Sequence, residues 1–232
     1  MRKVMVVGSC EQSDFLLLAC KVLSRSDGRV LFIDGSRSRS TTHFISSLLH
    51  VGEIVEFEGF DMGVHFTTYS DVLNWLEEQG QGAYDFVIVQ SDDRNFYEGC
   101  SPEAMDFHVI LTQFDKGSIQ RNEQILADLC LAERAMIPFA RLYVPYVLCS
   151  IQEEYIEERY NKLAVHWLEE RVRIHYDERL YERYIDGQFA ERLNLKRLPR
   201  AYRRQVIAFA QCISGLEMKL IKQAFRKARR RL

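Results

Sequence analysis

The stretch "MVVGSCEQSDFLLLACKVL", residues 5–23, decides the fold that we expect. It begins as an apolar strand, is interrupted at Gly8, and continues with apolar residues at helical spacing from Asp14 to Leu23. A strand that passes through a glycine into a loop and then a helix is the layout of a phosphate-binding loop. The stretch therefore raises the question of whether a nucleotide site is retained here, has been lost, or never existed.

Apolar runs continue to alternate with helical segments along the rest of the chain. We expect strands at 3–8, 29–34, 84–93, 106–114 and 139–149, and a hairpin or irregular edge strand within 53–66. We expect helices at 14–23, 40–50, 70–80, 118–135, 151–172 and 200–232, and a short strand followed by a helix within 173–189. Ser40 or Thr41 and Ser70 are the expected N-caps of the second and third helices. The pattern predicts one doubly wound α/β domain over 1–232, a mostly parallel sheet flanked by helices, with ligands at the carboxyl ends of the strands.

Composition is that of an ordinary globular protein. The 232 residues are 47% hydrophobic, enough for one large core. No apolar run reaches the length of a membrane span or of a signal peptide, so we expect a cytoplasmic protein. The six cysteines are scattered without a C-x-x-C pair, which favours reduced thiols and gives no support for a metal site.

The loop after Gly8 departs from the P-loop pattern G-x-x-x-x-G-K-[ST] where that pattern carries its chemistry. Its second glycine falls at Ser13, its lysine at Asp14 and its hydroxyl residue at Phe15. The lysine position thus carries an anion, which repels phosphate. Phe15 has no oxygen to offer Mg²⁺.

Later segments add to this opening in a fixed order. "GRVLFIDGS" follows the first helix, "YDFVIVQSDD" follows after that, and "RIHYDERLYERYIDGQF" leads towards a terminal helix. In this order the chain resembles the MinD/ParA family of P-loop ATPases, whose motifs are KGGxGKT, kVLLIDxD and YDxIIID. The resemblance spans essentially the whole chain, and it implies that the doubly wound α/β fold expected from the alternation is of the P-loop NTPase-like kind.

Every family motif is degenerate here. The family's signature lysine falls at Ser9, and its glycines fall at Cys10, Glu11 and Ser13. Asp34 is kept, but the second aspartate of D-x-D is Ser36.

The Walker B aspartate falls at Gln90, with Asp92 and Asp93 displaced beyond it. Phosphoryl transfer depends on positioning and electrostatic stabilisation by the groups that are missing here. We therefore expect a pseudo-ATPase that does not hydrolyse ATP, has no catalytic or metal-binding residues and uses no cofactor; ATP binding is not expected. The vestigial nucleotide loop comprises Gly8, Ser9, Ser13, Asp14 and Asp34. The alternative is an unrelated α/β domain whose first loop fits by coincidence.

Within the family, the members with atypical P-loops that this chain most resembles are the Tad-pilus CpaE/TadZ proteins. The resemblance implies an adaptor that localises or assembles a membrane-associated machine, such as a pilus, secretion or cell-pole system, by binding its proteins. It also implies a homodimer, because the family dimerises across the nucleotide face. Two other functions stay open: a nucleotide-binding regulatory ATPase with a non-standard site, and a partitioning-type adaptor for DNA or protein.

Three smaller features have a structural and a functional interpretation. Cys10 precedes a helix but has no His in its motif, which favours a structural cysteine over a nucleophile. Residues 91–93 with Asp34 could gather carboxylates around a metal, although capping and solvated acids are the commoner use. The acidic run 152–160 is expected to be a solvated helix face, with a partner-docking face as the alternative.

The C-terminus is a basic amphipathic tail helix, which we expect at 219–232. From Met218 onward there are seven Lys or Arg and no acid, so the remainder of the chain carries a charge of about −9. Such a helix can lie on an anionic membrane, dock on an acidic protein or be simply solvated. Peripheral attachment to the inner face of the cell membrane is thus an expectation, and nucleic acid is not an expected partner. The residues expected to contact membrane or partner are Lys219, Leu220, Lys222, Phe225, Arg226, Lys227, Arg229, Arg230 and Arg231.

Overall fold

The computed structural model describes residues 1–10, 14–45, 54–80, 82–131, 136–163 and 165–230. Eight strands in this part of the chain form one sheet. They are β1 (Arg2–Val7), β2 (Val30–Asp34), β3 (Ile54–Phe57), β4 (Phe60–Gly63), β5 (Phe86–Ser91), β6 (Phe107–Thr112), β7 (Ile137–Tyr146) and β8 (Val165–His175). Their order across the sheet is β3-β4-β2-β5-β1-β6-β7-β8, and all neighbours are parallel except the β3–β4 hairpin. The expected doubly wound α/β sheet is confirmed.

Helices connect these strands on both sides of the sheet. The described α-helices are α1 (Asp14–Leu23), α2 (Tyr69–Gln79), α3 (Lys116–Leu131), α4 (Glu153–Tyr160), α5 (Glu178–Phe189), α6 (Arg200–Ser214) and α7 (Met218–Arg230). Short 3-10 helices are η1 (Ser40–Phe44), η3 (Asn95–Tyr97) and η4 (Pro102–Ala104). Within the described part of the chain, none of the helices combines the length and the apolar character needed to cross a membrane.

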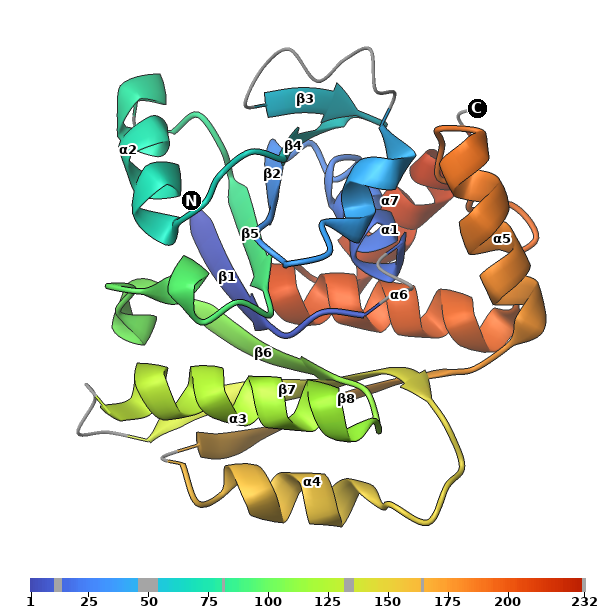
Figure 1. Ribbon diagram of the computed structural model, residues 1–232. Coiled ribbons are helices and arrows are strands. Elements are labelled where there is room, and N and C mark those ends of the chain that lie inside the picture. Colours follow the sequence, from blue (N-terminus) through green and yellow to red (C-terminus); the bar gives the residue numbers. More distant parts are fainter. Residues whose placement is uncertain (11–13, 46–53, 81, 132–135, 164, 231–232) are drawn as a thin grey trace.

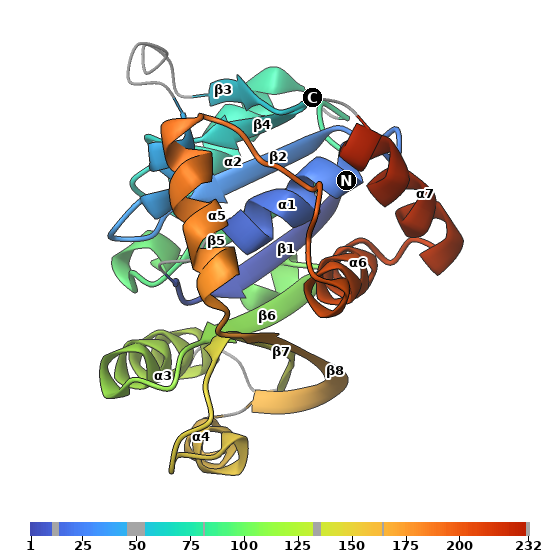
Figure 2. The same ribbon diagram turned by 90° about the vertical axis from the view of Figure 1, so that its right-hand side faces the viewer.

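Two hydrophobic cores lie on opposite faces of the sheet. Helices α1, α5, α6 and α7 cover one face, and α2, α3 and α4 cover the other (Figures 1 and 2). Alternate residues of β1 serve the two cores: Val6 packs with the α1 side and Val7 with the α3 side. Burial on both faces explains why the central strands are continuous apolar runs.

Two expected helices are wrong in their extent. Residues 151–172 were expected to form one helix, but the helix ends at Tyr160 and Val165–His175 form the edge strand β8. The segment expected as one helix at 200–232 forms two helices within its described residues, because Gly215 adopts a left-handed conformation (φ 69°) that ends α6. The expected tail helix thus begins as a separate element at Met218.

Smaller corrections concern caps and ends. The N-cap of α2 is Thr68, which forms a capping box with Asp71, and Ser70 lies within the helix. The expected helix at 40–50 is the 3-10 helix η1 at Ser40–Phe44, whose N-cap is Arg39; residues 46–50 lie outside the described part. The hairpin within 53–66 is confirmed as β3 and β4.

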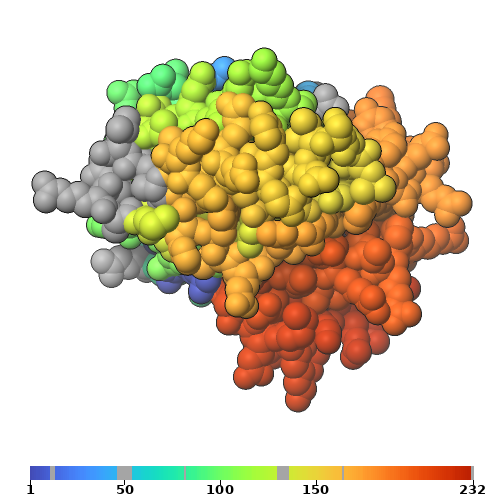
Figure 3. All heavy atoms as spheres, turned by 90° about the horizontal axis from the view of Figure 1, so that it is seen from below, coloured from blue at the N-terminus to red at the C-terminus, as the bar shows by residue number. Residues whose placement is uncertain are grey.

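The acidic run 152–160 has an inward-facing side that the sequence did not reveal. Glu153 on α4 is buried; it forms an ion pair with Arg171 at 3.0 Å and accepts hydrogen bonds from Arg173. Glu157 forms ion pairs with Arg141 at 2.9 Å and with Arg171 at 2.8 Å. These pairs join α4 to β7 and β8, on the side of the molecule that Figure 3 shows, where α4 lies in front in yellow. The expected solvated face is therefore present but limited: Glu154, Tyr155 and Glu158 are exposed, whereas Glu153 is buried and Glu157 is half-buried.

Candidate functional site

The vestigial loop starts at the carboxyl end of β1, next to the ends of β5 and β6. Gly8 has φ +107° and donates its N–H to Ser91 O at 2.7 Å. A Cβ at this position would lie 2.1 Å from Leu111 O and 2.9 Å from the Asn122 side chain, so only glycine fits. The close approach of Leu111 and Asn122 is thus enough to explain why this position is a glycine, and no bound phosphate is needed for that explanation. Ser9 O accepts a hydrogen bond from Gln113 Nε2 at 3.3 Å, and Ser13 lies outside the described residues.

Phe15 belongs to the core, where the P-loop pattern has its Mg²⁺-binding hydroxyl. Its ring is 1% exposed and lies 5.8 Å from the Tyr202 ring and 5.2 Å from the Phe209 ring, both on α6. Asp14 opens α1 at the lysine position, and burial raises the pKa of its carboxyl to about 7 against the opposing attraction of Arg183 on α5. A helix that starts with a partly neutral acid and a core aromatic ring presents neither a side-chain cation for phosphate nor a hydroxyl for Mg²⁺ at these two positions.

Asp34 is retained, but its carboxylate is already fully bonded within the protein. Oδ1 accepts from Ser36 N at 2.9 Å and Ser36 Oγ at 2.5 Å. Oδ2 accepts from Thr41 N at 3.2 Å and Thr41 Oγ1 at 2.5 Å. The carboxylate is 1% exposed and fixes the segment that follows β2. The Thr41 contacts were not foreseen; the sequence offered Thr41 only as a helix cap.

The end of β5 also serves the loop structure. Gln90, at the Walker B position, is buried and donates from Nε2 to Gly8 O at 3.3 Å. Asp92 accepts the Arg37 N–H at 2.9 Å and lies 3.4 Å from the Arg121 guanidinium. Asp93 caps its own turn by accepting the Asn95 N–H at 3.1 Å. Among the described residues there is no group of three or more His, Cys, Asp or Glu placed to hold a metal ion.

These contacts decide whether Mg²⁺-ATP fits the described residues. The structure brings Gly8, Asp34 and Gln90 together at the carboxyl ends of neighbouring strands, as the resemblance implies. However, the Mg²⁺-hydroxyl position is a core phenylalanine, and the retained aspartate has no free oxygen. This set of side chains does not fit a magnesium nucleotide. Cys10 is buried, in agreement with a structural role.

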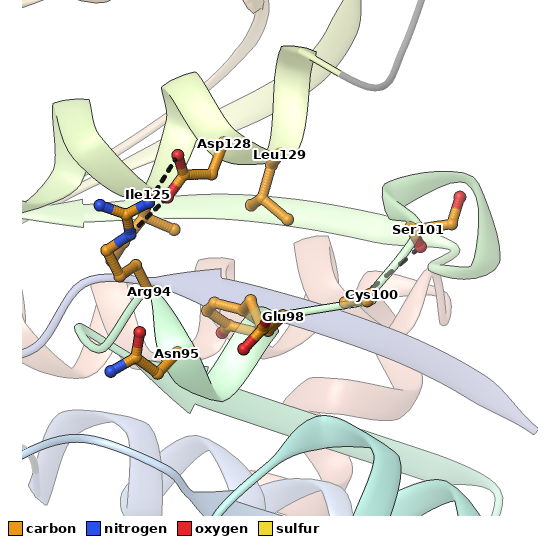
Figure 4. Close-up of a pocket in the computed structure, with 10 residues that line it drawn as sticks. Arg94, Asn95, Glu98, Cys100, Ser101, Ile125, Asp128 and Leu129 are labelled. Atoms are coloured by element: carbon orange, nitrogen blue, oxygen red, sulfur yellow. Dashed lines mark hydrogen bonds and ion pairs between the residues drawn. The ribbon is translucent and has the colours of Figure 1, made fainter.

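A pocket lies on the face of the sheet opposite α1, between α3 and the segment that follows β5 (Figure 4). Arg94 Nε reaches Asp128 Oδ2 at 2.7 Å across its rim, and Ile125 and Leu129 form an apolar wall. Burial raises the pKa of the Cys100 thiol in this pocket to about 12, so the thiol stays protonated and weakly nucleophilic at neutral pH. The walls thus offer a satisfied ion pair and no reactive group.

The tail helix α7 has its apolar stripe covered by the domain itself. Ile221, Ala224, Phe225 and Ala228 are buried against α1 and α6. The expectation that Phe225 contacts a membrane or partner is therefore wrong for this conformation, because its ring is 3% exposed.

The cations of α7 lie on the outer side of the helix. The exposed ones are Lys219, Lys222, Arg226, Lys227, Arg229 and Arg230, with Leu220 half-exposed beside them. Lys227 lies 3.5 Å from Asp27, and Arg231 lies outside the described residues. What the tail presents outward is thus mainly charge.

An exposed apolar row on α5 was missed in the sequence. Tyr181, Ile185 and Phe189 recur at every fourth position; Tyr181 and Ile185 are each 37% exposed, and Phe189 is 89% exposed. Leu148, after β7, and Tyr176, after β8, are exposed at the same carboxyl edge of the sheet. The i, i+4, i+8 spacing was the available signal, but it does not tell which side of a helix faces the core.

Solved structures with the same fold include proteins from three different organisms. MinD of Pyrococcus furiosus superposes with a TM-score of 0.58 at 14% identity, over 93% of this chain and 99% of that one. MinD in the MinC:MinD complex of Aquifex aeolicus gives 0.56 at 12% identity, over 94% and 97%. A plasmid partition protein of Borrelia burgdorferi bound to AMPPNP gives 0.56 at 11% identity, over 97% and 98%.

These likenesses concern the fold, and they confirm the resemblance to MinD/ParA ATPases at that level. Neither a scan against protein-family models nor a search of curated proteins finds a match to the sequence. The chain thus has the MinD/ParA fold over nearly its full length, with a nucleotide loop of different chemistry.

Proposed function

We propose that this protein is a non-hydrolysing member of the MinD/ParA group that acts as a binding and positioning adaptor. The observation that carries the proposal is the burial of Phe15 between Tyr202 and Phe209. Because Phe15 packs in the core, the first turn of α1 stabilises the fold and has no hydroxyl for Mg²⁺. The carboxylate of Asp34, whose oxygens are already hydrogen-bonded, also supports the absence of a nucleotide site. On this proposal neither ATP nor Mg²⁺ binds at the loop, and the carboxyl edge is free for protein contacts.

The proposed contact surface is the α5 row of Tyr181, Ile185 and Phe189. Exposed large apolar side chains grouped on one helix are typical of protein interaction sites. Such a row can pack antiparallel on a symmetry-related copy of itself, with Tyr181 against Phe189 and Ile185 against Ile185. We therefore propose a homodimer that forms without nucleotide, at the edge of the sheet where the resemblance places the family's dimer.

The partners of such a dimer would be proteins of a membrane-associated assembly. A neighbour with this fold, MinD of Aquifex aeolicus, is seen in complex with MinC, which supports a role in protein assemblies. The exposed cations of α7 support peripheral attachment to an anionic membrane on the cytoplasmic side. Since the apolar stripe of α7 is covered, this attachment would be electrostatic and sensitive to salt.

Sedimentation velocity without nucleotide tests the proposal. We expect a dimer for the wild type and a monomer for Phe189→Asp. The matched control is Met136→Asp, which places the same charge on a 60% exposed apolar residue at the amino end of β7. A wild-type protein that is monomeric, or that dimerises only with ATP, would contradict the adaptor as proposed.

A further inference from the structure

A hollow lined by cations lies between the tail helix and the connection from α5 to α6. We call it the cationic hollow. Its walls are formed by Lys196 and Arg197 from the connection and by Arg226, Arg229 and Arg230 from α7. Figure 2 shows the connection running past the C-terminal end of α7 on its way to α6. Residues some thirty positions apart in sequence are thus brought to one site.

Each wall of the cationic hollow is held by the core behind it. On α7, burial of Ala224, Phe225 and Ala228 turns Arg226, Arg229 and Arg230 outward. The latter three are spaced i, i+3 and i+4, and therefore share one side of the helix.

The connection is fixed from the opposite side. Leu193 and Leu195 are buried, and Leu193 O accepts from Lys21 Nζ at 2.7 Å. Leu193 N donates to Glu58 Oε1 at 2.8 Å, and Glu58 pairs in turn with Lys21 at 2.6 Å. Arg197 adopts a left-handed conformation with φ 60°, which costs energy for a residue with a side chain. The connection therefore presents its cations from a fixed and locally strained backbone.

The charges of the cationic hollow are not neutralised by the described protein. None of its five side chains forms an ion pair with a carboxylate of the described residues, whereas Lys227 on the same helix does pair with Asp27. Glu58, behind the hollow, is occupied by Lys21. Like charges gathered in one concavity repel one another and focus a positive potential. An anionic ligand would relieve that repulsion.

From this geometry we propose that the cationic hollow is a binding site for an anion with two or more neighbouring phosphate groups. Arginine binds phosphate through two parallel N–H···O bonds, and four of the five side chains are arginines. A single carboxylate or monophosphate would leave most of the five charges unmatched. The ligand is either a free polyphosphate or the headgroup of a multiply phosphorylated lipid, and both share this chemistry. The site uses α7 cations that the proposed function assigns to membrane contact, but it is separate from the vestigial loop and from the α5 row, so its failure would leave the dimer test of the proposed function unaffected.

The test compares two double variants that remove the same charge by the same substitution. Arg226→Gln/Arg230→Gln alters the cationic hollow, and Arg200→Gln/Arg204→Gln alters exposed cations of α6 outside it. All four residues are exposed, so both variants are expected to keep the wild-type melting temperature. Titration calorimetry with tripolyphosphate at low salt and without Mg²⁺ measures the free ligand. Flotation with phosphatidylcholine vesicles that contain phosphatidylinositol 4,5-bisphosphate measures the headgroup, against vesicles matched in charge with phosphatidylserine.

We expect the Arg226/Arg230 variant to bind about tenfold more weakly and the Arg200/Arg204 variant to stay within about twofold of the wild type. Binding of tripolyphosphate with this pattern assigns the site to a free anion. Binding confined to the bisphosphate vesicles, with the same pattern, assigns it to a lipid headgroup. Excess Mg²⁺ is expected to weaken binding, because it neutralises the phosphates.

Several outcomes would overturn the proposal. These are the absence of binding to either ligand, equal losses in the two double variants, and equal binding to phosphatidylserine vesicles, which would reduce the tail to a diffuse positive surface. Tighter binding with Mg²⁺ would place the phosphate site elsewhere. Binding of random duplex DNA without binding of tripolyphosphate would make nucleic acid the ligand.

Discussion

Replacing Phe15 by threonine, the residue that the P-loop pattern requires, is expected to destabilise the fold. The Phe15 ring is 1% exposed and lies within 6 Å of the Tyr202 and Phe209 rings. Large-to-small changes at buried phenylalanines cost about 3–5 kcal/mol, and the threonine hydroxyl would be buried in an apolar environment. Since a domain is stable by only about 5–15 kcal/mol, this one change would remove a large share of the total.

Urea unfolding followed by circular dichroism and tryptophan fluorescence measures this loss. The control is Phe15→Leu, which keeps an apolar side chain of similar size and is expected to cost less than about 1.5 kcal/mol. If Phe15→Thr unfolds at the same urea concentration as the wild type, the ring does not support the core as described. The start of α1 would then be free to hold a nucleotide, and the argument from burial would fail.

Three further outcomes follow from the same contacts. The double variant Asp14→Lys/Phe15→Thr is expected not to hydrolyse ATP, because Gln90 remains at the Walker B position and catalytic groups act as a unit; measurable turnover would refute this. Burial raises the pKa of Asp14 to about 7, so between about pH 4 and 7 the folded state binds more protons than the unfolded state. Its contribution to stability therefore falls as pH rises through that window, and Asp14→Asn is expected to lose this decline; parallel stability curves for the two proteins would count against it. Phe225→Glu is expected to lower the melting temperature strongly, whereas Lys222→Glu on the exposed side of α7 leaves it nearly unchanged; equal melting temperatures would show that α7 is not docked.

The central part of the fold could be predicted because its signals are local. The stretch from β1 to Leu23 consists of a continuous apolar strand followed by apolar residues at helical spacing, and α1 begins and ends at the predicted residues. Strand β8 was mistaken for helix because it is an edge strand. Its charged residues Arg171 and Arg173 are satisfied by α4, and that pairing is not visible in the sequence.

The sequence predicted where the vestigial nucleotide loop lies, whereas the role of its residues in the core became visible only in the structure. The sequence identified Asp14 and Phe15 as wrong for phosphate, but only the packing shows that Phe15 serves the core. The amphipathic character of the tail was also plain, but amphipathicity does not tell what covers the apolar side. Here α1 and α6 cover it, so Phe225 lies inside and the cations remain outside.

Steady-state turnover of ATP and GTP by the purified protein shows whether the degenerate loop still works as a nucleotide site. We expect no turnover above about 10⁻³ s⁻¹ with Mg²⁺, since the loop lacks the lysine and the hydroxyl and Asp34 is saturated by Ser36 and Thr41. Asp34→Ala is the control that separates this site from a contaminating ATPase. Turnover above that rate that disappears in Asp34→Ala would contradict the account, because it would show that the retained aspartate still serves a working nucleotide site.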